Sequence, residues 1–252
     1  MQFCSIGSGS RGNGTLIEQD DTCILVDCGF SLAETESRLA RQGRSPEQLS
    51  AILVTHEHGD HIRGVGVLSR RYHIPVYMTA GTWRGYRRDD IEALHCISAH
   101  EVFSIGALEI TPVAVPHDTV EPCQFLVAAG SSCVGVLTDL GSVTAHVQAA
   151  YSRCDALVLE FNHDEQLLDE GPYPLSVKRR VAGDWGHLSN RQAARLLADL
   201  PIERLQHLVV AHISETNNSL AHAQQALDSL VQQPQRVHWA DQDVGCDWLK
   251  IG

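Results

Sequence analysis

Short apolar runs rich in β-branched residues alternate along this chain with segments whose apolar residues recur at helical spacing. The runs predict strands at Gln2–Ile6, Thr15–Glu18, Thr22–Val26, Ala51–Thr55, Leu108–Val115, Gln124–Ala128, Cys133–Thr138, Ala156–Glu160 and Leu208–Ala211. The spaced segments predict helices at Leu32–Gln42, His61–Tyr72, Thr82–Asp89, Val143–Ala150, Asn190–Leu200 and Leu220–Val231. Hairpins come early and β–α alternation comes later, which favours an α/β fold of two mixed sheets sandwiched between helices.

Two local patterns sharpen this picture. Ser189 followed by Gln192 forms a capping box, a start signal for the helix expected from Asn190. The segment Asp164–Gly186 shows no periodicity and contains two prolines, so we expect a long surface loop there. Loops of that length are often functional.

Length and composition fit one globular domain spanning residues 1–252, with 43% hydrophobic and 20% charged residues. The start of the chain lacks the basic and apolar regions of a secretion signal, and no apolar run is long enough to span a membrane. The eight cysteines are scattered, several of them inside apolar runs, which is typical of reduced thiols in a core. We therefore expect a cytoplasmic protein.

The net charge of −12 argues against a general nucleic-acid binder. It does not exclude a nuclease, because bound metal ions add positive charge where phosphate must sit. Two basic clusters are candidate phosphate contacts, although each alone is more typical of a solvated surface: Arg84, Arg87, Arg88 and Lys178, Arg179, Arg180.

The stretch Thr55–Gly64, THEHGDHIRG, concentrates histidines and acids as ordinary cores and surfaces do not. Four strands each deliver a histidine or an aspartate just past their ends, namely His56, His117, Asp139 and His212. We expect these ends to share one edge of the fold, where layered α/β folds build their sites.

Together the close cluster and the strand ends offer the nitrogen and oxygen ligands that two divalent metal ions need. The alternatives are purely structural roles: Asp60 only caps the next helix, and His117 or His212 is an ordinary strand-end histidine. The cluster makes each of these harder to sustain separately.

The set THEHGDH, His117, Asp139 and His212 resembles the metallo-β-lactamase fold, a four-layer αββα sandwich with a two-metal site. The resemblance covers nearly the whole chain. It implies that one metal is held by His56, His58 and His117, the other by Asp60, His61 and His212, with Asp139 bridging. The metal could be zinc, manganese or iron, because such ligands accept all three.

Departures from sibling patterns narrow the branch. Metallo-β-lactamases proper lack a bridging aspartate like Asp139, and oxygen-reducing di-iron relatives carry an acid where this chain has His58. Glyoxalase-type thioesterases share all seven ligands and remain an alternative. The later elements LVLEFNHDE, GHLSN and AHIS resemble the ribonuclease Z group, yet the Gly/Pro-rich arm that grips tRNA is missing between His61 and His117.

The opening GSGSRGNGT, with LVDCGFS, NHD and GPYP, is most similar to the YycJ/WalJ-like exonuclease branch, and PhnP-type phosphodiesterases are a second comparison. The resemblance implies a metal-dependent phosphodiesterase that uses a metal-bridging hydroxide, and within that class it favours a DNA 5′-exonuclease. A cyclic phosphodiesterase and a glyoxalase-II-like thioester hydrolase stay open as alternatives. The expected partner is DNA or another phosphodiester, with no membrane.

Further residues are candidates for roles beside the metals. Asp60 is expected to orient the hydroxide, and His163 or His187 to assist the leaving group. Glu160 is a candidate for orienting one of these imidazoles, and Asp27 for supporting a ligand. The alternative for His187 is a histidine stacked on the helix start, and for His163 it is a supporting hydrogen-bond partner. The candidate substrate-binding residues are Ser10, Asn13, Lys178 and Arg179.

Overall fold

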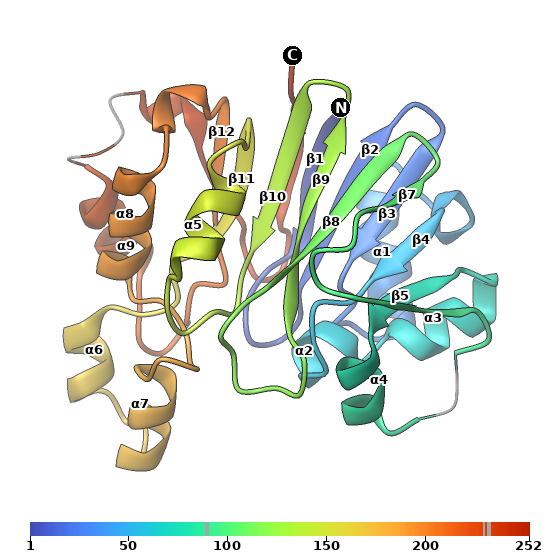
Figure 1. The fold of residues 1–252 in the computed structure, drawn as a ribbon. Coiled ribbons are helices and arrows are strands. Elements are labelled where there is room, and N and C mark those ends of the chain that lie inside the picture. The colour runs from blue at the N-terminus through green and yellow to red at the C-terminus, as the bar shows by residue number, and fades with distance from the viewer. Residues whose placement is uncertain (89–90, 229, 231–232) are drawn as a thin grey trace.

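The computed structural model describes residues 1–88, 91–228, 230 and 233–252 and consists of two seven-stranded sheets packed face to face (Figure 1). The first sheet has the order β14 (Cys246–Lys250), β1 (Gln2–Gly7), β2 (Gly14–Gln19), β3 (Thr22–Val26), β4 (Ala51–Leu53), β5 (Val76–Thr79), β6 (Leu94–Ile97). The second has the order β13 (Val237–Trp239), β12 (His207–Ala211), β11 (Ala156–Glu160), β10 (Ser132–Leu137), β9 (Cys123–Ala129), β8 (Leu108–Ala114), β7 (Phe103–Ile105).

Helices cover the outer face of each sheet (Figure 1). On the first sheet lie α1 (Leu32–Arg41), α3 (Val65–Tyr72) and α4 (Ala80–Tyr86), and on the second lie α5 (Ala145–Tyr151), α8 (Asn190–Asp199) and α9 (Leu220–Leu227). Short 3-10 turns occur at Pro46–Gln48, Ile202–Arg204 and Pro234–Arg236. This is the predicted four-layer αββα sandwich.

Three apolar clusters correspond to the three interfaces between these layers. The middle cluster joins Phe3 and Ile17 of the first sheet to Ile110 and Phe125 of the second, all 0% exposed. A second cluster packs the second sheet against α5, α8 and α9, and a third packs the first sheet against α1, α3 and α4. Apolar burial of this extent is the main force that holds the layers together.

Each predicted strand is present, but the sequence analysis missed β5, β6, β7, β13 and β14. These strands have five residues or fewer, and β6, β7, β13 and β14 are the outermost or next-to-outermost strands of their sheets. Edge strands are partly exposed and too short to show alternation, so their pattern is weak.

The predicted helix His61–Tyr72 is wrong as a single element, because it is broken at Gly64 into α2 (Gly59–Ile62) and α3. A Cβ atom at Gly64 would lie 2.1 Å from the carbonyl oxygen of Phe30, so only glycine permits this close backbone approach. The helix α2 has His58 as its N-cap residue, which removes the alternative that Asp60 is merely a cap.

The predicted loop Asp164–Gly186 is also wrong, because it contains α6 (Glu165–Glu170) and α7 (Leu175–Val181). Asp164 caps α6 by accepting hydrogen bonds from the backbone of Gln166 and Leu167. No residue of α7 is buried, so no apolar period marked this helix in the sequence.

Other helix boundaries shift by a few residues, and the predicted ends Asp89 and Val231 lie outside the described residues. The capping box of Ser189 and Gln192 at the start of α8 is confirmed. Each of the eight cysteines is a free thiol, and six are buried. Among the described residues, no helix has the length and apolar character needed to cross a membrane.

Candidate metal centre

The carboxyl ends of parallel strands build the candidate site. Strands β3 and β4 run parallel in the first sheet, and β10, β11 and β12 run parallel in the second. At these ends or just past them lie Asp27, His56, Asp139, Glu160 and His212. The edge lies opposite the chain termini, where α2 is seen at the bottom of the sandwich in Figure 1.

Three of these strand-end residues adopt the left-handed conformation that non-glycine residues rarely take. The φ angles are 62° at Asp27, 53° at Asp139 and 51° at His212. Such backbone strain persists only where the surrounding structure enforces it, and it is concentrated at functional sites. Here it turns each side chain from the strand direction into the shared cluster.

One group of ligand atoms, which we name the histidine half, comes from His56, His58 and His117. Their rings lie with centroids 4.8 to 5.0 Å apart. The Thr55 hydroxyl lies 2.9 Å from His56 Nδ1, and His117 Nδ1 lies 3.0 Å from the carbonyl oxygen of Gly186. Because the carbonyl can only accept, the His117 proton sits on Nδ1 and leaves Nε2 as a free ligand atom.

A second group, the carboxylate half, comes from Asp60, His61 and His212. Asp60 Oδ2 lies 3.6 Å from His61 Nε2 and 3.5 Å from His212 Nε2. Asp139 lies beside this half, with Oδ2 2.9 Å from His61 Nε2 and Oδ1 3.2 Å from His212 Nδ1. Asp139 also groups with His56 and His61, so it stands between the two halves.

Several of these converging atoms make no hydrogen bond among the described residues. They are Nε2 of His56, both carboxylate oxygens of Asp139 and both ring nitrogens of His212. Buried polar atoms are almost always paired, because burial without a partner costs free energy. The residues therefore fit a cation that would satisfy these lone pairs together.

Protonation states of the metal-free site differ between the halves. Burial lowers the pKa of His56, His58 and His117, so these imidazoles are neutral at pH 7. Burial opposes the charging of His61 and His212, but neighbouring carboxylates outweigh it and raise both pKa values, that of His212 to about 10. Burial likewise disfavours ionised Asp60 and Asp139, yet the adjacent histidines hold both pKa values below the ordinary range.

Buried polar groups hold the candidate ligands in place through hydrogen bonds. Asp27 accepts a hydrogen bond of 2.8 Å from His61 Nδ1, and the same carboxylate accepts from the backbone N–H and the hydroxyl of Thr55. This is the supporting position expected for Asp27. Because the Thr55 hydroxyl donates to Asp27, it accepts from His56 Nδ1, which leaves His56 Nε2 free for a metal.

Asn13 is placed differently from its prediction as a substrate-binding residue. Its side chain is 5% exposed, with Nδ2 3.0 Å from His61 Nε2 and Oδ1 accepting from the Gly9 backbone at 2.8 Å. Its backbone N–H donates to the carbonyl of Asp60. Asn13 therefore ties the glycine-rich turn to the ligand loop, and the substrate-binding assignment is corrected to this supporting role.

Glu160 and His187 lie together on the far side of Asp139. The Glu160 carboxylate is 0% exposed and accepts from the backbone of Leu140 at 2.9 Å and of Leu188 at 3.1 Å. His187 Nδ1 lies 3.1 Å from Glu160 Oε2 and 3.3 Å from Asp139 Oδ1. Glu160 thus orients His187 by accepting from Nδ1, so that Nε2 is left for other contacts.

The cluster opens into a cavity of ≈ 440 Å³, here called the metal-site cavity. Its lining includes the ligands His58, Asp60, Asp139 and His212, together with His187. The rim supplies Ser10, Asn162, Tyr173 and Arg180. Ser10, a predicted substrate-binding residue, therefore lies at this cavity.

Three predicted residues lie elsewhere. His163, Lys178 and Arg179 line a separate cavity on the other side of α7. Burial lowers the pKa of His163 to about 4, so its imidazole is neutral at pH 7 and is not the imidazolium acid that would protonate a leaving group.

Asp118 and Arg180 form an ion pair beside the histidine half. Asp118 lies 3.7 Å from His58 Nε2 and 3.6 Å from His117 Nε2, and it accepts a hydrogen bond from Arg180 Nε of α7. The only signal for Asp118 in the sequence is its position directly after His117. Of the basic run Lys178–Arg180, Arg180 lines the metal-site cavity. The packing of α7 decides which of these side chains faces it.

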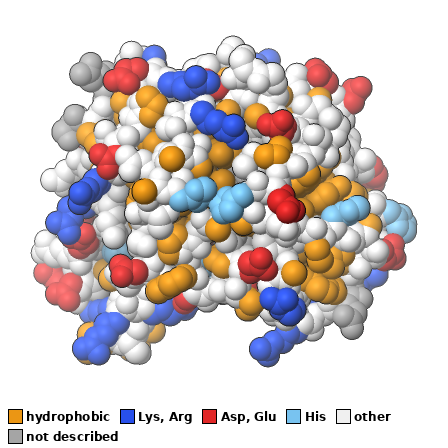
Figure 2. All heavy atoms as spheres, viewed as in Figure 1, with side chains coloured by type: hydrophobic (Ala, Val, Ile, Leu, Met, Phe, Trp, Pro, Cys, Tyr) orange, Lys and Arg blue, Asp and Glu red, His pale blue; other side chains and the backbone are white. Residues whose placement is uncertain are grey.

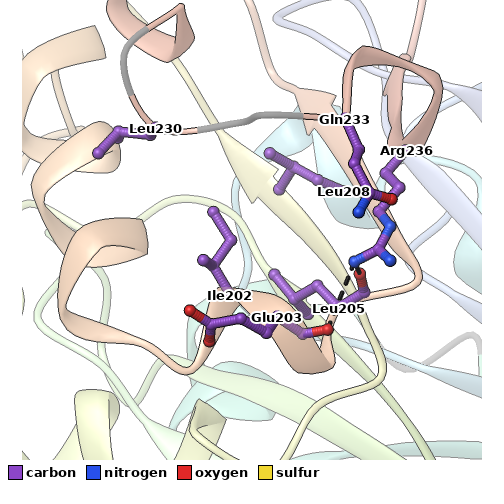
Figure 3. Close-up of a pocket in the computed structure, with 7 residues that line it drawn as sticks. All are labelled: Ile202, Glu203, Leu205, Leu208, Leu230, Gln233 and Arg236. Atoms are coloured by element: carbon purple, nitrogen blue, oxygen red, sulfur yellow. Dashed lines mark hydrogen bonds between the residues drawn. The ribbon is translucent and has the colours of Figure 1, made fainter.

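A further pocket, shown in Figure 3, lies at the far end of the second sheet and is mainly apolar. Its lining includes Ile202, Leu205, Leu208 and Leu230, and its cation, Arg236, donates to the backbone carbonyls of Glu203 and Leu205. On the face shown in Figure 2, acidic and basic side chains are interspersed and form no basic stripe. Neither feature offers chemistry that competes with the metal-site cavity.

Comparisons with known proteins agree with this geometry. The family model described as the β-lactamase superfamily domain matches residues 22–213. The chain is 33% identical over 237 residues to exodeoxyribonuclease YycJ of Bacillus anthracis, which covers 92% of this chain and 90% of the relative. It is 34% identical over 230 residues to exodeoxyribonuclease WalJ of Streptococcus pneumoniae serotype 2, covering 88% and 86%.

Among solved structures, the metallo-β-lactamase-fold protein YhfI from Bacillus subtilis superposes over 99% of both chains with a TM-score of 0.75 and 18% identity. At that identity the likeness concerns the fold. The αββα architecture expected from the sequence is confirmed by both kinds of comparison.

Proposed function

This chain belongs to the β-lactamase superfamily, and we propose that it is a metal-dependent DNA exonuclease that hydrolyses phosphodiester bonds from the 5′ end. The observation that carries the proposal is the similarity to two exodeoxyribonucleases over most of both chains. The converging histidines and carboxylates of the candidate metal centre provide the chemistry, and they imply divalent metal ions.

Divalent ions would be held by the histidine half and by the carboxylate half, with Asp139 available as a ligand to either. Neutral imidazoles and ionised carboxylates are the forms that bind zinc, manganese and iron. Bound ions would lower the pKa of a water molecule and neutralise phosphate oxygens. The chain supports this by keeping His56, His58 and His117 neutral through burial.

Asp60 is the ligand best placed to orient the attacking water. Both Asp60 and Asp139 line the metal-site cavity, but the Asp60 side chain is 22% exposed, whereas Asp139 is 1% exposed and lies deeper. A second carboxylate oxygen at the cavity wall can accept a hydrogen bond and direct a lone pair of the water toward the phosphorus. This role for Asp60 is in addition to its role as a ligand.

We assign protonation of the leaving oxygen to His187 rather than to His163. His187 lines the metal-site cavity, and Glu160 and Asp139 flank its Nδ1. The imidazolium form of His187 would donate its Nε2 proton to the leaving oxygen, while its Nδ1–H stays hydrogen-bonded to Glu160. Glu160 is a positioning residue here, because its carboxylate touches His187 and two backbone amides.

The rim of the metal-site cavity suits a polymer with a charged backbone and aromatic bases. Arg180 is exposed and lines the cavity, where its guanidinium is held by an ion pair with Asp118. Tyr173 lies between Pro172 and Pro174, which restrict its backbone and so preset the position of its ring. Aromatic and arginine side chains together are typical of single-strand binding.

The test is a cleavage assay of manganese-loaded protein on DNA oligonucleotides labelled at the 5′ or the 3′ end, with Asp139→Ala as the control. Progressive loss from the 5′ end, absent in the control, is the expected result. A metal-replete protein that leaves DNA intact and hydrolyses a cyclic nucleotide or a thioester would replace this proposal by one of those activities.

A further inference from the structure

A second cavity of ≈ 250 Å³ lies beside the metal-site cavity. Its wall includes His163, Leu168, Asp169, Leu175, Lys178 and Arg179. Nothing in the proposed chemistry uses it. Its composition, apolar side chains with a few converging polar groups, is that of a ligand pocket.

The two cavities share a wall. Helix α7 directs Val177, Arg180 and Val181 into the metal-site cavity, and Leu175, Lys178, Arg179 and Ala182 line the second cavity. The neighbouring residues Asn162 and His163 divide in the same way between them. A strand whose scissile phosphate sits at the metals would therefore have an adjacent nucleotide at the second cavity.

His163 is the buried polar group of this second cavity. It is 2% exposed, and its Nδ1 has no hydrogen-bond partner in the part of the chain that the structure describes. Leaving such an atom unpaired costs free energy that a ligand with a hydrogen-bonding edge would recover. The backbone around it is fixed, since the His163 carbonyl accepts from Asn190 and its strand bridge pairs it with Ser189.

Charges on the wall favour an anion. Arg179 has no ion pair or hydrogen bond with the described residues, and Lys178 Nζ donates only to the backbone carbonyl of Asp169. Of the two acids, Glu165 is already paired with Arg191 at 2.8 Å and accepts from the Ser189 hydroxyl at 3.0 Å. Asp169 is exposed and remains as the one uncompensated acid at the cavity.

Apolar surface completes the pocket. Leu168 is 3% exposed and closes the floor, whereas Leu175 is 61% exposed at the rim. A large apolar side chain so exposed beside two cations is suited to the face of a flat, polar-edged ring.

We propose that the second cavity is a subsite for the nucleotide adjoining the scissile phosphodiester, with its phosphate on Lys178 and Arg179 and its base against Leu168 and Leu175, hydrogen-bonded by His163. The proposal rests on the proposed DNA activity and deepens it. In this proposal Lys178 and Arg179, predicted as substrate-binding residues, bind one particular phosphate of the DNA. His163 recognises a base instead of donating a proton to the leaving group.

The experiment compares two substrates of manganese-loaded protein. A single-stranded DNA oligonucleotide is long enough to reach both cavities, whereas bis(p-nitrophenyl) phosphate has no adjoining nucleotide to place in the second cavity. The variants are Lys178→Ala/Arg179→Ala and His163→Ala, with Arg195→Ala as the matched control. Arg195 is an exposed cation of α8 that lines neither cavity.

We expect the ratio of kcat/KM for the oligonucleotide to kcat/KM for the small diester to fall roughly tenfold in the double variant, mainly through KM, since charge-assisted hydrogen bonds are lost. His163→Ala is expected to lower the same ratio and to flatten the preference for one base at the adjoining position. His163→Gln, which restores a side-chain hydrogen-bonding group, should recover part of the loss. Arg195→Ala should keep the wild-type ratio.

Each adverse result has a separate meaning. An unchanged ratio in variants that melt at the wild-type temperature would overturn the subsite while leaving the DNA activity intact. An equal fall on both substrates would also overturn it, because the residues would then act on the metal centre. Wild-type protein that hydrolyses only the small diester would refute the DNA exonuclease proposal itself.

Discussion

The histidine half and the carboxylate half of the metal centre lie side by side but are built on different electrostatics. In the histidine half, neutral partners hold the imidazoles: the Thr55 hydroxyl for His56 and a backbone carbonyl for His117. In the carboxylate half, a buried acid, Asp27, accepts from His61 at 2.8 Å, and Asp60 itself carries charge. The acid beside the first half, Asp118, is ion-paired with Arg180, whereas the second half contains Asp60 and has Asp27 bound to His61.

This difference predicts an order of metal affinity. A cation gains Coulomb energy from each nearby carboxylate, and a carboxylate behind an imidazole raises the basicity of that ligand. His58 is also the most accessible histidine of the set, with 29% of its side chain exposed. We expect the carboxylate half to hold its ion more tightly, and the histidine half to exchange first.

The largest effect is expected from Asp139→Ala, because Asp139 belongs to both halves. Metal content and turnover should fall together, turnover by at least about 100-fold, since even changes behind the ligands cost up to that much. Metal analysis by mass spectrometry and the oligonucleotide assay measure the two quantities. Asp139→Asn is the matched control for the fold, since asparagine tolerates the φ of 53° at this position. Full metal and full turnover in Asp139→Ala would contradict the bridging role.

A smaller and asymmetric effect is expected from removing one ligand of each half. His117→Ala should lose the ion of the histidine half. It should keep the other ion during a chelator titration, because the carboxylate half is intact. His212→Ala should lose the tighter ion, and its remaining metal should leave at the lower chelator concentration. Identical titration curves for the two variants would remove the proposed order of affinity.

Next in size is Asp27→Asn, which leaves every ligand in place. The buried acceptor for His61 Nδ1 becomes a neutral amide, and metal affinity is expected to fall by about 10- to 100-fold in the carboxylate half alone. Thr55→Ser keeps the hydroxyl that joins Asp27 to His56 and serves as the control. Competition with a fluorescent chelator measures both affinities, and equal weakening in the two variants would mean that general destabilisation is responsible.

The sequence predicted the layers and the clustering of the candidate ligands because both depend on local pattern. The central strands are continuous apolar runs, and His56, Asp139 and His212 stand just past such runs, so strand ends could be aligned without coordinates. Edge strands such as β6 and β13 gave too little pattern. The break at Gly64 depends on contact with the distant carbonyl of Phe30, which no local rule contains.

The supporting and substrate-side residues were harder to predict for the same reason. Asn13 and Ser10 lie three positions apart in one glycine-rich turn, yet one is buried against the ligand loop and the other faces the cavity. Likewise, Arg179 and Arg180 are consecutive but face different cavities, because α7 separates them. Residue type and spacing indicate chemistry, whereas the face of a short exposed helix is set by tertiary packing.

The smallest expected effect concerns the stability of metal-free protein, which should depend on pH in opposite directions for the two halves. The pKa of His212 is raised from 6.5 to about 10 by carboxylates that outweigh its burial, so its contribution to stability is complete below pH 6.5 and is lost as the pH rises toward 10. The lowered pKa of His56 has the opposite sign: the unfolded chain binds the proton first, so stability falls as the pH drops below 6.5.

Urea denaturation at pH 5.5, 7 and 9 measures both effects. Between pH 7 and 9, metal-free wild-type protein should lose stability and His212→Gln should lose less of it. Between pH 7 and 5.5, His56→Gln should lose less than wild type, because it removes a buried imidazole that resists protonation. Asp60 and Asp139 stay ionised over this whole range, since their pKa values are lowered, and so add no slope of their own. Parallel pH profiles in all three proteins would show that the two halves carry the same charge, and the contrast between them would fail.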